Sequence, residues 1–130
     1  MGAGVRLTRA RVCTGGLLPL LLAVAACGGG ADATRQAVSS IENGRLLLQQ
    51  YGCGSCHAIP GVANARGNVG PTLAGIKGRV YIAGFLPNTR ENLARWIESP
   101  RAVDPLTAMP DLQVPAVHAA DMVAYLYSGR

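Results

Sequence analysis

Cys53, Cys56 and His57 lie within five consecutive residues, Cys53-Gly54-Ser55-Cys56-His57, and their spacing indicates a specific chemistry. Two thiols separated by two residues can reach the two vinyl groups of one porphyrin and form two thioether bonds. The histidine that follows is then held beneath the iron, where a neutral imidazole nitrogen is a good axial ligand. We therefore predict one covalent haem c, attached at Cys53 and Cys56, with His57 as an iron ligand.

Two cysteines at this spacing also occur in thiol–disulfide oxidoreductases and in zinc sites. An oxidoreductase of that kind needs a β-α-β context, and the sequence around Cys53 gives no sign of one. A zinc site needs two further Cys or His ligands in paired spacing, and His118 is the only other histidine. A chance match to so short a pattern is the third alternative, and haem attachment fits the rest of the sequence best.

The second axial position of the iron decides between two functions. An iron whose second position is filled by the protein exchanges electrons, whereas an open position binds small ligands or reacts with peroxide. Met122 falls on the apolar side of a predicted helix, which is typical of core packing, and His118 lies among polar neighbours in the first turn of that helix. Met109 stands in a loop between Pro105 and Pro110 and is the strongest candidate, although a loop methionine can also simply fill a gap.

Three helices are predicted to position these residues, at about 40–51, 89–98 and 115–127. In each, apolar residues recur on one side at helical spacing, and polar caps or prolines mark the ends. Gly- and Pro-rich loops connect them, and Val80-Tyr81-Ile82 is the only weak strand signal. Loops of this length are unusual in a small domain. A large apolar cofactor at the centre explains them, because the loops can pack on it, and we expect an all-α fold.

The first 26 residues have the properties of an export signal. Arg6, Arg9 and Arg11 precede the apolar run Leu17 to Ala26, which ends in small residues. This run is shorter than the roughly 20 residues that a bilayer-spanning helix needs. We predict cleavage of residues 1–26, with a retained short membrane anchor as the alternative.

Val24-Ala25-Ala26-Cys27 resembles the lipobox of bacterial lipoproteins, in which the cysteine is acylated and becomes the first residue of the mature chain. We predict lipidation of Cys27, a flexible glycine-rich tether over residues 27–38, and a folded domain over residues 39–130. The protein is then exported and lipid-anchored at the periplasmic or outer face of a bacterial membrane. The alternative is ordinary cleavage that leaves Cys27 as a free thiol.

The charge of the chain does not indicate nucleic-acid binding. Cleavage of residues 1–26 leaves nine of the twelve basic residues against seven acidic ones, so the sequence pI of 9.4 overstates the charge of the mature protein. No dense Lys/Arg patch remains to neutralise phosphates. Lys77 is the only lysine, which also excludes a docking face ringed by lysines.

From Ser40 to Arg130 the sequence resembles the class I cytochromes c, because its motifs follow the order of that family. These motifs are Gly44 in the first helix, Cys53 to His57, Gly70-Pro71-Thr72-Leu73, Gly75-Ile76-Lys77-Gly78-Arg79, the helix ending before Pro100, Met109, and Ala124-Tyr125-Leu126. Further motifs resemble the cytochrome c domain fused to subunit II of caa-type haem–copper oxidases: Leu86-Pro87-Asn88-Thr89, Asn92 to Ile97, and Ala108-Met109-Pro110. That subunit also has membrane helices and a copper-binding cupredoxin domain, which the printed sequence does not contain.

The resemblance implies roles for residues around the haem. The carbonyl of Pro71 accepts a hydrogen bond from the ring of His57. Arg79 and Thr107 contact haem propionates, although Arg79 could also be an ordinary solvated loop charge. Trp96 packs on the haem near Met109, which the resemblance supports as the second iron ligand.

The resemblance also implies that the first and last helices cross, and it shows one departure from the family pattern. Gly44 and Tyr125 are expected where the first and last helices cross. The family tryptophan that often contacts a propionate has no counterpart here, and Asn88 is nearby in sequence.

The function implied is that of a mono-haem c-type cytochrome with the class I fold, three main helices and long loops around one haem. It is expected to carry single electrons in a bacterial respiratory chain and not to be an enzyme. Expected partners are a quinol–cytochrome c reductase and a terminal cytochrome oxidase or a dehydrogenase. The alternatives are a haem enzyme or ligand sensor with an open sixth site, and an electron-accepting subunit of a periplasmic dehydrogenase.

Overall fold

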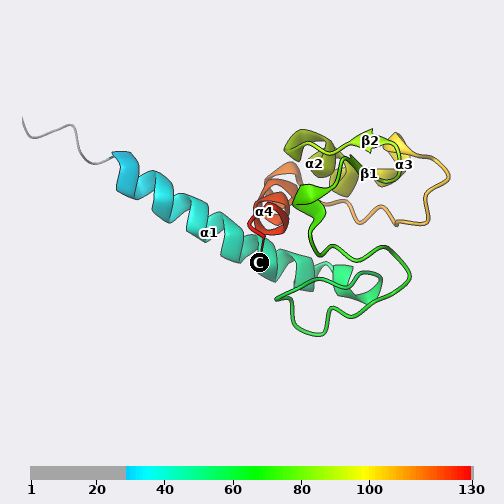
Figure 1. Ribbon diagram of the computed structural model, residues 1–130, viewed down its shortest axis with the longest axis horizontal. Helices are drawn as coiled ribbons and strands as arrows, with labels where there is room; N and C mark the ends of the chain where they lie inside the picture. The colour runs from blue at the N-terminus through cyan, green and yellow to red at the C-terminus, as the bar shows by residue number, and fades with distance from the viewer. Residues whose placement is uncertain (1–28, 130) are drawn as a thin grey trace, which may run out of the picture.

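The computed structural model describes residues 29–129, and the predicted signal and Cys27 lie outside this range. Helices dominate the described part of the chain, with two short 3-10 helices and one small sheet (Figure 1). In chain order the elements are α1 Gly29–Gln50, η1 Cys53–Ser55, η2 Ile76–Gly78, β1 Tyr81–Ile82, β2 Leu86–Pro87, α2 Arg90–Glu98, α3 Pro100–Val103 and α4 Ala116–Tyr127.

Helix α2 agrees with the sequence prediction to within one residue, because its ends are encoded locally. The Thr89 hydroxyl accepts a hydrogen bond from the backbone N–H of Asn92 at 3.1 Å and so caps the first turn. Hydrogen bonds from its own backbone N–H and from Thr89 hold the pKa of Glu91 below its ordinary value. Pro100 follows the helix end and begins α3, a short helix within a segment predicted to be a loop.

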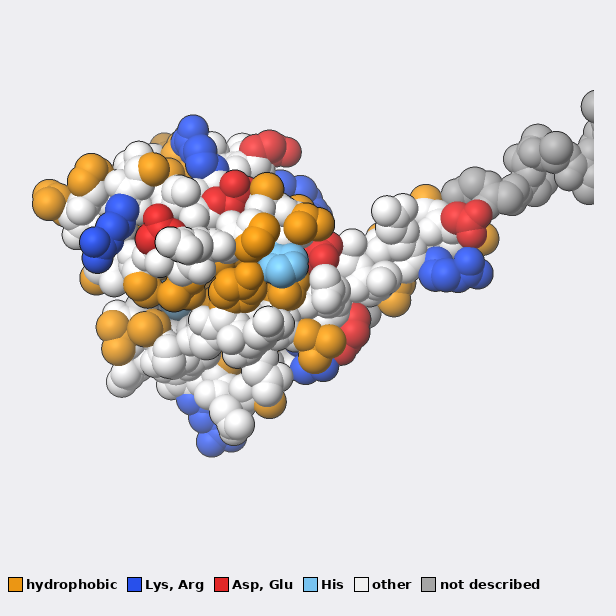
Figure 2. Space-filling model, turned by 180° about the vertical axis from the view of Figure 1, so that it is seen from behind, with side chains coloured by type: hydrophobic (Ala, Val, Ile, Leu, Met, Phe, Trp, Pro, Cys, Tyr) orange, Lys and Arg blue, Asp and Glu red, His pale blue; other side chains and the backbone are white. Residues whose placement is uncertain are grey.

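Helix α1 begins earlier than predicted, and residues 29–38 are helical where we expected a flexible tether. Consecutive glycines occupy only residues 28–30 of the predicted tether, and alanines with Arg and Gln, which favour helix, follow them. Asp32 and Arg35 also pair one turn apart at 3.1 Å. This half of α1 extends away from the rest of the structure, with its side chains exposed (Figure 1 and Figure 2). No helix within residues 29–129 is both long and apolar enough to cross a membrane.

The weak strand signal at Val80-Tyr81-Ile82 corresponds to real pairing. Strand β1 pairs antiparallel with β2, and Ile82 lies opposite Leu86. Both of these side chains are buried, so the hairpin is stabilised by its contact with the core rather than by its length.

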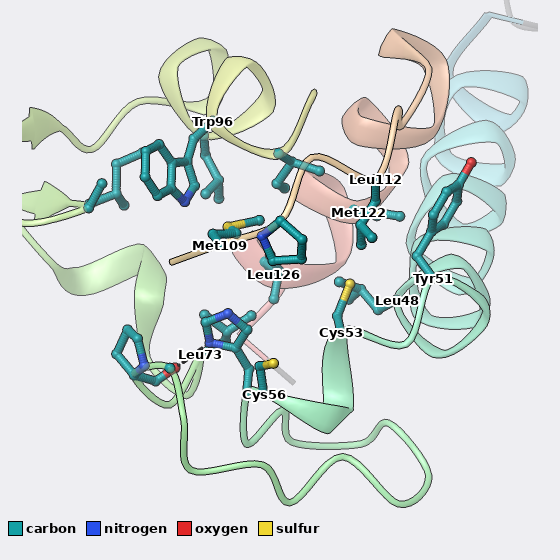
Figure 3. A pocket seen from close by; sticks show the side chains of 18 of the residues that line it. Leu48, Tyr51, Cys53, Cys56, Leu73, Trp96, Met109, Leu112, Met122 and Leu126 are labelled. Carbon is teal, nitrogen blue, oxygen red and sulfur yellow. Dashed lines mark hydrogen bonds between the residues drawn. The ribbon is translucent and has the colours of Figure 1, made fainter. Parts of the chain in front are cut away.

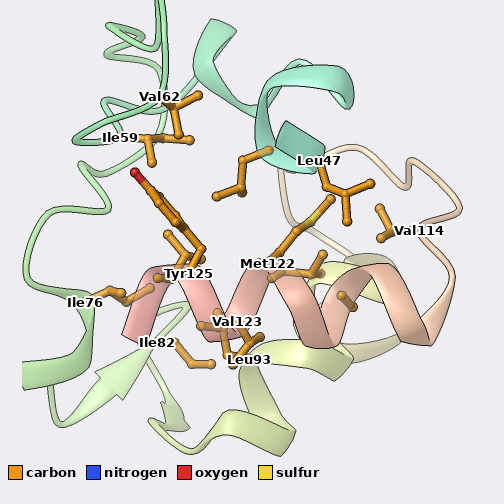
Figure 4. Close-up of a cluster of buried hydrophobic side chains, with 14 of the residues drawn as sticks. Leu47, Ile59, Val62, Ile76, Ile82, Leu93, Val114, Met122, Val123 and Tyr125 are labelled. Atoms are coloured by element: carbon orange, nitrogen blue, oxygen red, sulfur yellow. The ribbon is translucent and has the colours of Figure 1, made fainter. Parts of the chain in front are cut away.

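The core lies where α1 and α4 cross, with α2 packed on the other side of α4 (Figure 4). Gly44 sits at this crossing as expected: a Cβ atom built on it would lie 1.9 Å from the backbone oxygen of Asp121. Helix α4 fills the centre with Met122, Val123 and Tyr125, each at most 3% exposed. The crossing therefore depends on the absence of a side chain at Gly44.

Replacing Gly44 with Ala is expected to force the two helices apart. Such overpacking costs about 2 kcal/mol, which for a domain of about 100 residues lowers Tm by on the order of 10 °C. Gly30→Ala is the matched control in the same helix, because a Cβ atom there has no atom within 4 Å. Thermal unfolding followed by circular dichroism separates the two variants. Equal Tm values for both would show that α1 and α4 do not approach this closely.

Candidate functional site

A single apolar cavity of about 370 Å³ brings together the site residues predicted from the sequence (Figure 3). Its walls come from the end of α1, η1, residues 69–83, α2, the loop before α4, and α4 itself. The predicted residues that line it are Cys53, Cys56, His57, Pro71, Arg79, Trp96, Thr107 and Met109. The fold thus unites segments up to about half the chain apart in sequence.

A tight turn after α1 presents the two cysteines and the histidine to the cavity. Gly52 has a positive φ of 69°, which ends the helix, and η1 follows directly. The carbonyl of Cys53 accepts hydrogen bonds from the backbone N–H groups of Cys56 and His57, at 3.3 and 3.0 Å. All three side chains therefore lie on one short, closed turn, and Figure 3 shows both thiols at the same side of the cavity.

The environment of Cys53 does not suit a thiol–disulfide oxidoreductase. Burial raises the pKa of the Cys53 thiol above its ordinary value. Reactive dithiol pairs have the opposite property, because their function needs a stabilised thiolate. This shift therefore argues against a reactive thiolate at Cys53.

The ring of His57 is fixed by its neighbours in the loop that follows. Its Nδ1 lies 2.7 Å from the carbonyl oxygen of Pro71, the contact expected from the resemblance. Because a carbonyl only accepts, Nδ1 carries the proton and Nε2 keeps its lone pair for a metal. Gly70 permits this arrangement, since a Cβ atom on it would lie 2.3 Å from Cε1 of His57.

Met109 approaches the cavity from the opposite side, together with Trp96 (Figure 3). The loop that carries Met109 is held by local hydrogen bonds. The Asp104 carboxylate accepts from the N–H of Leu106 at 3.0 Å, and the Thr107 hydroxyl oxygen accepts from the N–H of Met109 at 3.1 Å. The structure thus places a thioether sulfur and an imidazole nitrogen on two sides of one apolar space.

The two other candidates for the second ligand have different surroundings. Met122 is fully buried and belongs to the core, although it also forms part of the cavity wall. His118 does not line the cavity, and its Nδ1 lies 2.9 Å from the hydroxyl of Tyr51. His118 has polar neighbours in sequence, which suggested a surface position, but it is half-buried because this contact joins the end of α1 to the start of α4.

Among residues 29–129, Arg79 is the only Arg, Lys, Asp or Glu in the cavity wall. Its Nη2 donates to the carbonyl of Thr72 and, at 3.4 Å, to that of Ala74. Within residues 29–129 its Nε and Nη1 groups have no hydrogen-bond partner. A half-buried cation with free donors beside an apolar cavity favours a ligand that carries an anionic group.

Sequence reasoning missed how residues 58–70 fold beneath the cysteines. The N–H of Gly67 donates to the carbonyl of Gly54 at 3.0 Å, and that of Gly70 donates to the carbonyl of Cys56 at 2.8 Å. The only signal for this packing was the number of glycines. It also missed that the side chain of Asn88 binds the backbone at Ile76 and Arg79.

The residues present fit a haem. The cavity is apolar, a nitrogen donor and a sulfur donor face it from different segments, two thiols stand at one side, and a cation is available for a carboxylate. Within residues 29–129 no three or more His, Cys, Asp or Glu side chains cluster as a metal site would require. A haem needs no such cluster, because the porphyrin itself supplies four of the iron ligands.

Replacing Gly70 with Ala is expected to push the His57 ring away from the carbonyl of Pro71. The ring resonances of His57 in NMR spectra should then shift, and its Nδ1 proton should exchange faster with solvent. Gly78→Ala is the control, because a Cβ atom there meets nothing within 4 Å. Unchanged His57 resonances in the Gly70→Ala protein would contradict this account of the ring.

Comparison with known proteins gives one informative similarity. The chain is 31% identical over 104 residues to a cytochrome c oxidase subunit 2 of Alkalihalophilus pseudofirmus. The match covers 78% of this chain but only 29% of that protein. The chain matches no family model, and no solved structure is similar to it.

Proposed function

We propose that the protein is a mono-haem c-type cytochrome with the class I fold that carries single electrons in a respiratory chain. The observation that carries this proposal is the cavity itself. Cys53, Cys56, His57 and Met109 all line it, and Met109, which is far away in sequence, lies across it from Cys56 (Figure 3). The similarity to part of a cytochrome c oxidase subunit 2 supports the same respiratory role.

Each residue has a defined task in this proposal. Cys53 and Cys56 would hold the cofactor covalently, and His57 and Met109 would bind its iron. The Pro71 carbonyl orients His57, while Arg79 and the Thr107 hydroxyl would bind the propionates. Trp96 and the other apolar walls exclude water. A haem held in this way supplies reversible one-electron exchange at its iron, and its methionine ligand favours a relatively positive potential.

The surface around the cavity suits a protein partner with an apolar docking face. Val69 and Leu112 line the cavity and are 78% and 38% exposed, and in the described part of the chain no acidic residue or lysine lines it. One face of the molecule carries a band of hydrophobic side chains with charged residues to either side (Figure 2). Interface cores are commonly poor in charge. We infer that the redox partner is a respiratory protein, a quinol–cytochrome c reductase or a terminal oxidase, that docks mainly through apolar contact.

The haem proposal is tested by producing the protein in a bacterial host that matures c-type cytochromes. Mass spectrometry is expected to show one covalent haem. The oxidised protein should show the weak absorption at the red end of the spectrum that arises from Met–iron charge transfer. Met109→Ala should abolish this band, lower the midpoint potential and let the reduced protein bind carbon monoxide, because the sixth site opens.

Met122→Leu and His118→Ala are the controls, and both should keep the band. Loss of the band in Met122→Leu but not in Met109→Ala would assign the ligand to Met122. Rapid carbon monoxide binding by the unaltered protein would instead identify an open site and an enzyme or sensor. If the protein purified from this host carries no covalent haem, the proposal is overturned altogether.

We further propose that Cys27 is acylated and anchors the protein at the periplasmic or outer face of a bacterial membrane. A tether of this kind raises the effective concentration of the carrier near membrane-bound partners. The unaltered protein is expected in the membrane fraction, with an acylated N-terminal Cys27 in mass spectra. Cys27→Ser should move it to the soluble fraction with its haem intact. A mature chain that starts at another residue would contradict acylation.

A further inference from the structure

Asn88 uses every polar group of its side chain to join three parts of the fold. Its Nδ2 donates to the carbonyl of Ile76 at 2.7 Å and to that of Arg79 at 2.8 Å. Its Oδ1 accepts from the hydroxyl of Tyr127 near the end of α4. Its backbone N–H donates to the carbonyl of Val80 at 3.0 Å. The side chain is half-buried, so these partners are not readily replaced by water.

These contacts fix the backbone from which Arg79 projects into the cavity. Both carbonyls that Asn88 binds belong to the turn formed by η2 and Arg79. The guanidinium itself is tied only to the carbonyls of Thr72 and Ala74, through one of its three nitrogens. The direction of the Arg79 side chain toward the cavity therefore depends on the position of its backbone, which hydrogen bonds from Asn88 fix.

The Tyr127 side of this arrangement is also well supported. The Tyr127 hydroxyl donates to Asn88, and burial raises the pKa of this phenol above its ordinary value. The guanidinium of Arg90 lies over the Tyr127 ring, 4.7 Å from its centre. Asn88 thus accepts a hydrogen bond from Tyr127 of α4 and donates two to the turn that carries Arg79.

We propose that Asn88 is a positioning residue that aims the Arg79 guanidinium at a carboxylate of the bound cofactor and so raises its reduction potential. The inference rests on the proposed haem function. A cation close to a carboxylate offsets negative charge near the iron and favours the reduced form. Asn88 does not line the cavity, so its influence passes through Arg79.

The test measures midpoint potentials of the haem-loaded protein by redox titration. Asn88→Ala should lower the midpoint potential. At a given applied potential the ratio of oxidised to reduced protein should rise by up to about tenfold, which corresponds to about 59 mV for one electron. In an Arg79→Gln background the same substitution should cause no further shift. Asn92→Ala is the matched control, since Asn92 also donates to a backbone carbonyl, that of Pro87, but does not touch the turn of Arg79.

Two results would overturn the inference. One is a lower Tm with an unchanged potential in Asn88→Ala, which is the result expected of a purely structural residue. The other is a shift that persists in the Arg79→Gln background. If Asn88→Ala does not fold, Tyr127→Phe replaces it, because it removes one contact of Asn88 and should give a smaller shift that also depends on Arg79. Failure of the unaltered protein to bind haem would refute the proposed function instead, and it is seen before any variant is made.

Discussion

The contact between the backbones of α1 and α4 at Gly44 determines the position of most of the site. Because Gly44 has no side chain, the two helices approach until a Cβ atom could not fit against Asp121. This close crossing fixes the direction of the last turns of α1, from which the turn bearing Cys53 follows directly. It also fixes the side of α4 whose Met122 and Leu126 form part of the cavity wall. The absence of a side chain at Gly44 therefore orients both the turn that bears Cys53 and the part of the cavity wall that α4 forms.

The long loops are organised by this helical frame and by the cavity. Residues 58–80 contain little paired structure, yet backbone hydrogen bonds from Gly70 to Cys56 and from Leu73 to Ala58 hold them against the turn that bears the two cysteines. Apolar residues from these loops, such as Leu73 and Ile76, face the cavity. A haem in this cavity would bury the apolar side chains of these loops. A covalent haem would therefore replace much of the packing that such loops otherwise lack.

The accuracy of sequence reasoning followed the range of the interactions involved. Helix α2 was placed to within one residue, because Thr89 and Pro100 mark its ends through local contacts. The start of α1 was misplaced, because glycines suggested a tether while the alanines after them continued the helix. The β1–β2 hairpin was underrated, because what stabilises it is burial of Ile82 and Leu86, and no local pattern reveals burial.

The sequence by itself determined the chemistry: two thiols, an imidazole and a loop thioether, in types and spacing that few functions share. Residues within a five-residue turn are necessarily close in space, because so short a segment strongly limits the relative positions of its side chains. Only the tertiary structure decided which distant residues meet them. Met109 and Trp96 lie across the cavity from Cys56. His118 forms a hydrogen bond with Tyr51 and does not reach the cavity. The side-chain amide of Asn88 donates to the backbone. Such contacts depend on how helices cross and loops pack, and those are properties of the whole chain.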